Sequence, residues 1–121
     1  MKTTNSVNKD TNLIECITLW IHESKNGVEY LSGNLSDELR GGRVIGFFNS
    51  KKKNPKEPDV RVYSVDKDGN QDVEIASLWE NISIAENRYL LGKTNENENI
   101  IGFYDEKQAK KPYIRIYLEK E

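Results

Sequence analysis

Few side chains in this chain could do chemistry, and they do not gather in the sequence. His22 is the only histidine and Cys16 the only cysteine. Six residues along one strand place two side chains about 20 Å apart, which rules out a Cys–His couple. The sequence has no further metal ligands at a suitable spacing. It also has no phosphate-binding glycine loop between a strand and a helix. We therefore predict no enzyme, no metal and no cofactor, and a buried Cys16.

Lysines and aromatic side chains indicate binding instead. One basic cluster, three adjacent lysines and a fourth close by, stands in a chain of net charge −2. It fits a phosphate backbone or an acidic partner, or else a solvated loop that protects a sheet edge. Aromatic side chains and an arginine on one strand face would stack unpaired bases at ~1–3 kcal/mol per base, or would only pack on each other as framework. The predicted partner-binding residues are Lys51, Lys52, Lys53, Lys56, Trp20, Tyr30, Arg61 and Tyr63.

The elements that must position these residues come from a stretch that the chain carries twice. Leu19-Trp20 and Tyr30-Leu31-Ser32-Gly33 return as Leu78-Trp79 and Tyr89-Leu90-Leu91-Gly92. Two further segments recur downstream in the same order, and the copies differ in length only between the matching segments. Loops tolerate such changes and strands do not, so the pattern indicates a duplicated β-meander.

Residues that favour strands fill the matching segments, and Asn26-Gly27 is a strong hairpin signal. A short helical turn near residues 36–39 is the only helix that we expect. The fold class is therefore all-β, with two tandem four-stranded antiparallel meanders that form a sandwich or a closed barrel of about eight strands. We predict a flexible tail at 1–12 and a single domain at 13–121, made of repeat one (13–65) and repeat two (73–118). The predicted strands span 13–21, 28–35, 43–49, 60–65, 73–79, 88–94, 100–104 and 113–118.

Alternation of side chains sorts the strand residues into two faces. We predict that one face is the aliphatic core and that the other holds the aromatic residues and arginines. In the third strand of each repeat this assigns Ile45 with Phe47, and Ile101 with Phe103, to the core. The glycines Gly46 and Gly102 are assigned to the aromatic face, where a ring could lie over them.

Composition bounds the setting of the protein. A pI near 5.6 argues against a strongly basic nucleic-acid binder. One cysteine cannot form an internal disulfide, no apolar run reaches the ~20 residues of a membrane helix, and the start lacks the apolar core of a signal peptide. We expect a cytoplasmic protein that does not enter the membrane.

One motif runs Leu19-Trp20, Ser24-Lys25, Gly27, Tyr30-Leu31-Ser32-Gly33, Phe47, Asn49, Lys51-Lys52 and Pro58-Asp59 with Arg61-Val62-Tyr63. On this motif the chain, over roughly 19–118, resembles a family of short uncharacterised β proteins, a domain of unknown function from bacteria, prophages and conjugative elements. The first repeat matches nearly throughout, and the second departs at several positions. The resemblance implies a small β domain in a phage or mobile-element context and transfers no catalytic residue.

Three hypotheses about function follow. The first is a non-enzymatic phage or mobile-element binding protein that inhibits a host defence nuclease by protein–protein binding, as anti-CRISPR proteins do. The second is an accessory protein that binds single-stranded nucleic acid, and the third an oligomeric component of a phage particle. The expected partner is a host protein or single-stranded nucleic acid, and a homodimer is left open.

Overall fold

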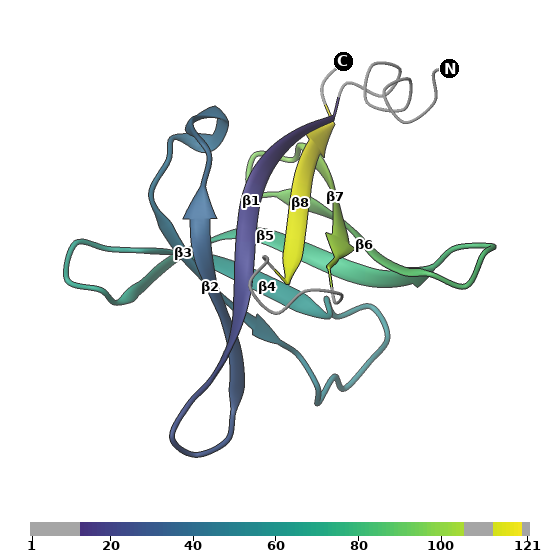
Figure 1. Cartoon of the computed structure of the whole chain (residues 1–121), viewed down its shortest axis with the longest axis horizontal. Helices are drawn as coiled ribbons and strands as arrows, with labels where there is room; N and C mark the ends of the chain where they lie inside the picture. Colours follow the sequence, from purple (N-terminus) through teal and green to yellow (C-terminus); the bar gives the residue numbers. More distant parts are fainter. Residues whose placement is uncertain (1–12, 106–112, 120–121) are drawn as a thin grey trace.

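The computed structural model of the chain describes residues 13–105 and 113–119 and is a closed antiparallel β-barrel (Figure 1). Its eight strands follow one another around the barrel in chain order. The helical element among these residues is one 3-10 turn, η1 (Asp37–Leu39), at the predicted position. The predicted tail, residues 1–12, lies outside the described residues. The strands are β1 (Leu13–Glu23), β2 (Glu29–Leu35), β3 (Arg43–Phe48), β4 (Val60–Val65), β5 (Gln71–Ile82), β6 (Arg88–Thr94), β7 (Asn99–Tyr104) and β8 (Ile114–Glu119).

Pairing of the first strand with the last decides between sandwich and barrel. β1 pairs with β8 from Leu13↔Glu119 to Leu19↔Ile114, so every strand has a hydrogen-bonded neighbour on both sides. The predicted all-β fold is confirmed, in its barrel form. The pairs β8–β1 and β4–β5, which join the two halves of the barrel, both contain register shifts. Such bulges increase the local bend and twist, which helps a sheet to close.

Apolar side chains from all eight strands fill the barrel. Because side chains alternate across each strand, one set faces the barrel axis and is buried, and the other set faces outward. Cys16 belongs to the interior, as predicted. The core consists of Cys16, Ile17, Leu19, Leu31, Val44, Val60, Val62, Ala76, Leu78, Leu90, Ile100, Ile114, Ile116 and Leu118.

The face prediction for the third strand of each half was wrong. Gly46 pairs directly with the core residue Leu31 and is buried, whereas Ile45 and Phe47 lie on the outer surface. Directly paired residues share a face, so register and not side-chain type places the glycine inside. The same holds for β7, where Gly102 pairs with Leu90 and faces inward. Ile101 and Phe103 therefore point outward.

Gly33 in β2 and Gly92 in β6 occupy equivalent positions at which the backbone lies very close to that of the neighbouring strand. A Cβ atom on Gly33 would overlap the carbonyl oxygen of Thr18, and one on Gly92 would overlap that of Ser77. Glycine is thus required by the close approach of two backbones, as at the corners of small barrels.

Aromatic side chains cover one end of the barrel. Tyr113 packs edge-on against Tyr104 and Phe48, with ring centroids 5.6 and 6.3 Å apart. The Tyr104 hydroxyl donates a 2.8 Å hydrogen bond to Glu80. Burial, followed by this hydrogen bond, raises the pKa of Tyr104 above its usual range. No helix in the described part of the chain is long and apolar enough to cross a membrane.

Candidate binding surface

The outer surface of the barrel carries two rows of cross-strand neighbours, one in each half, that match at four of their five positions. Both rows contain a tryptophan, an isoleucine, a tyrosine and a glutamate in the same order, and they differ at the second position. The first row is Trp20, Ser32, Ile45, Tyr63 and Glu74, and the second is Trp79, Leu91, Ile101, Tyr117 and Glu15.

Both arginines of the predicted binding face are held by glutamates across the junctions between the halves. Arg61 Nη1 lies 3.1 Å from Glu74 Oε2, and Arg115 Nη1 lies 3.5 Å from Glu15 Oε2. Each glutamate also accepts a hydrogen bond from a hydroxyl on its own strand. Side chains in these pairs are about one-third exposed, so each pair contributes little to stability, but it fixes the guanidinium. Arg61 is therefore committed to Glu74.

The predicted platform around Trp20 is interrupted by polar contacts. The Tyr30 ring stacks on His22 with centroids 5.2 Å apart, and His22 Nε2 lies 2.7 Å from Ser32 Oγ. A serine beside a histidine resembles an activated nucleophile, but such a pair needs a third group to orient the base. Within residues 13–105 and 113–119, no carboxylate bonds to the other ring nitrogen of His22.

The basic loop between β3 and β4 docks on the second half of the barrel. The indole nitrogen of Trp79 donates a 2.9 Å hydrogen bond to the carbonyl oxygen of Lys56. At the end of the loop, Asp59 accepts a 2.8 Å hydrogen bond from the Glu80 backbone and forms a 3.1 Å ion pair with Lys52. The loop therefore lies beside the tryptophan of the second repeat.

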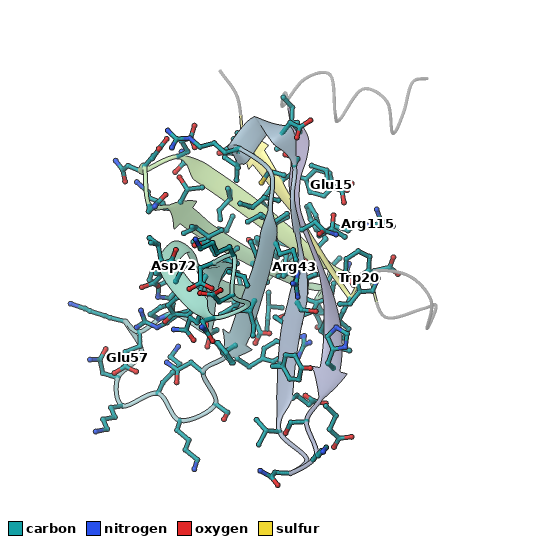
Figure 2. The ribbon with its side chains drawn as sticks, turned by 90° about the vertical axis from the view of Figure 1, so that its left-hand side faces the viewer. Glu15, Trp20, Arg43, Glu57, Asp72 and Arg115 are labelled. Atoms are coloured by element: carbon teal, nitrogen blue, oxygen red, sulfur yellow. The ribbon has the colours of Figure 1, made fainter. Side chains whose placement is uncertain are left out.

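This placement divides the predicted partner-binding residues. Figure 2 shows Glu57, in the basic loop, and Trp20 at opposite sides of the molecule. The aromatic pair Trp20 and Tyr30 lies on β1 and β2, Arg61 and Tyr63 lie on β4, and Lys52 is paired with Asp59. Because the basic loop packs onto β5, its lysines and Trp20 do not lie on one surface. The loop lysines that are exposed and have no ion pair within the described ranges are Lys51, Lys53 and Lys56.

A groove of about 570 Å³ on the outside of the second half is the feature that the sequence predictions missed. It lies beside Gly92 of β6, between Trp79 of β5 and the residues Asn99 of β7 and Glu119 of β8. Leu91 lines it and is 41% exposed; Ser32 holds the equivalent position in the first half. The sequence could have indicated this groove, because aligning the two repeats places the apolar Leu91 at the position of Ser32. The lining residues are Ser77, Trp79, Leu91, Gly92, Lys93, Thr94, Asn99, Ile100 and Glu119.

Cys16 and His22 lie in different surroundings, since Cys16 is buried in the core and His22 is exposed. Burial, more than the nearby Glu98 and Glu15, raises the pKa of the Cys16 thiol to about 12, so it stays protonated. No three metal-ligating side chains among the described residues lie close enough together to hold an ion. A second hollow of about 350 Å³, beside η1, is crossed by the 3.7 Å ion pair of Arg40 and Glu96.

Comparison of the chain with protein-family models, with curated proteins and with solved structures finds no match in any of the three. The resemblance of the first repeat to the β-protein family therefore stays a prediction. Function has to be argued from the surface alone.

Proposed function

We propose that this protein is a non-enzymatic binding protein of a phage or other mobile element, and that its partner is a host protein such as a defence nuclease that it inhibits. The groove beside Trp79 is the observation that carries the proposal. The barrel already encloses a complete core, yet Leu91 leaves 41% of its surface exposed in this groove. Apolar groups at a groove that the core does not need are typical of protein contact sites.

The choice of a protein over a nucleic acid follows from the groove's chemistry. Its accessible lining is mainly apolar, and Leu91 offers an aliphatic surface where a base would need an aromatic face. The single tryptophan at the groove, Trp79, uses its indole nitrogen to hold the basic loop. An apolar side chain of a protein partner fits this lining better than a row of stacked bases.

A direct binding measurement tests the proposal. The tagged protein is used to capture partners from its bacterial host, and a captured protein is then purified and titrated. Leu91→Ser, which installs the first repeat's residue, should weaken binding at least tenfold, about 1.4 kcal/mol. The matched control is Val28→Ser, which changes another exposed apolar residue, 60% exposed, on the first half. Equal affinities of wild type and Leu91→Ser would refute the use of the groove.

Single-stranded nucleic acid is the second candidate, favoured by the unpaired lysines at the docked loop. The loop that carries Lys51, Lys53 and Lys56 is held by the hydrogen bond from Trp79 to the Lys56 carbonyl oxygen, and Lys93 lines the groove. In that case a labelled single strand binds at low salt, weakens as salt rises, and is lost in Lys51→Glu/Lys53→Glu. Absence of binding at low salt would eliminate this candidate.

The phage-particle hypothesis receives no support from the described strands. It requires self-association through free sheet edges, and each of the eight strands is paired on both sides. Strand addition would first have to open the barrel. A sedimentation measurement at high protein concentration decides the matter.

A further inference from the structure

The hairpin of β5 and β6 projects beyond the barrel, as does the hairpin of β1 and β2 (Figure 1). Their tips have the same backbone design. In the second tip, Ser83 N donates to Asn87 O at 2.9 Å and Asn87 N donates to Ser83 Oγ at 3.1 Å. In the first tip the same bonds join Ser24 and Val28, at 2.9 and 3.2 Å. The chain thus contains two copies of one turn, which can be compared directly.

The side chains on the two tips differ in kind. Ile82 is 67% exposed and Ile84 is fully exposed, and the equivalent residues of the first tip are the charged Glu23 and Lys25. The first tip shows that the turn forms with charged residues at both positions. Neither isoleucine is therefore needed for the fold of the tip, and both forgo burial in the isolated protein. The first tip exposes one apolar side chain, Val28, on its other limb.

Backbone hydrogen bonds also close the second tip around Ile84. Glu86 has a φ of 67°, in the left-handed region where the first tip has Gly27 at 83°. The hydrogen bonds of Ser83 hold that conformation although the residue is not glycine. Because the turn is already closed by hydrogen bonds before binding, less conformational entropy is lost when Ile84 contacts a partner.

We propose that the tip formed by Ile82 and Ile84 inserts into an apolar pocket of the protein partner. This inference rests on the proposed function above. A convex pair of isoleucines is complementary to a concave apolar site. Glu86 is exposed at the tip and has no ion pair within the described part of the chain, so a basic rim around the pocket would complete the fit. The same carboxylate disfavours an anionic membrane surface or a nucleic acid.

The first tip supplies the variant that tests the proposal. Ile82→Glu/Ile84→Lys gives the second tip the residues that its twin already tolerates, so the barrel should melt at an unchanged temperature. With the purified partner of the groove experiment, this double variant should bind at least 30-fold more weakly. Glu23→Ala/Lys25→Ala is the matched control and should bind as wild type does. A benzoylphenylalanine photo-crosslinker in place of Ile84 should attach to a residue that lines an apolar pocket of the partner.

Each outcome separates this inference from the proposed function. If Leu91→Ser weakens binding and the tip variant does not, the groove stands and the tip proposal fails. If neither variant weakens binding, both fail. Binding of the wild-type protein to phosphatidylglycerol vesicles that is lost in the tip variant would assign the tip to a membrane and overturn the proposal. Cross-linking from position 84 to a polar, convex surface would overturn it as well.

Discussion

A methyl group on Gly92 should destabilise the barrel severely, because two backbones meet there. The Cβ of Gly92→Ala would overlap the Ser77 carbonyl oxygen and stand 2.8 Å from Leu78 Cα, where ordinary contacts begin near 3.4 Å. Both obstacles are backbone atoms, so relief requires the β5–β6 ladder to open around Leu78↔Gly92. Two lost ladder hydrogen bonds cost about 2 kcal/mol, and the disturbed packing of Leu90 about 1–3 kcal/mol more.

The expected loss is therefore roughly 3–5 kcal/mol, a large share of the roughly 5–15 kcal/mol that holds a typical domain together. Urea unfolding followed by tryptophan fluorescence measures it, since Trp79 stands on the affected strand. Gly102→Ala is the matched control: its Cβ would meet the side-chain atom Ile116 Cγ1 at 3.2 Å, which can move, so about 1 kcal/mol is expected. A Gly92→Ala midpoint equal to that of the wild type or of Gly102→Ala would refute the reasoning.

High pH and the strained turn give two further predictions. Because the folded pKa of Cys16 is raised from 9.0 to about 12, its contribution to stability is complete below pH 9 and is lost as pH rises toward 12, by about 1.4 kcal/mol per unit. From pH 8 to 11 the melting temperature should therefore fall less steeply for Cys16→Ala than for wild type. The raised pKa values of Tyr104 and Tyr117 keep part of the fall in both proteins. Equal slopes of melting temperature against pH would contradict this. Glu86→Gly should raise the free energy of unfolding by about 0.5–1 kcal/mol, and with it the urea midpoint, because glycine adopts the positive φ of this turn without strain. A lower midpoint would show that the Glu86 side chain makes a stabilising contact.

Sequence reasoning found the strands because their signals are local. β-branched and aromatic runs, the Asn26-Gly27 turn and the repeat itself mark all eight strands, and β4 and β6 span the predicted residues. Closure into a barrel is not a local property. It depends on the pairing of β1 with β8 and on the close backbone approaches at Gly33 and Gly92, which only the assembled sheet requires.

The inner and outer faces of β3 and β7 could not be read from alternation, because both faces carry apolar residues. Val44-Ile45-Gly46-Phe47 offers an aliphatic residue to each side, and the bulkier pair looked like core. The structure places the smaller pair inside, since the interior opposite Leu31 is already full. Larger side chains are then left for the outer surface, where Phe103 in the second half is 41% exposed.

The candidate site was only partly predictable for a related reason. The basic residues of loop 50–58 stand out as a cluster in the sequence, but the sequence does not say on which strand a loop will fold. The hydrogen bond from Trp79 to Lys56 places it on the second repeat. The differences between the repeats, Leu91 against Ser32 and Ile84 against Lys25, were visible in the alignment and indicate where the two halves depart from a shared framework.

Hydrogen–deuterium exchange of the protein with and without its purified partner tests the central claim most directly. The two halves have the same barrel framework, so each serves as the control for the other. We predict that the partner slows exchange at residues 77–93, which contain the hairpin tip and five of the groove's lining residues, and leaves the equivalent residues 18–34 unchanged. Protection confined to residues 18–34, or equal in both halves, would contradict the assignment of function to the second half of the barrel.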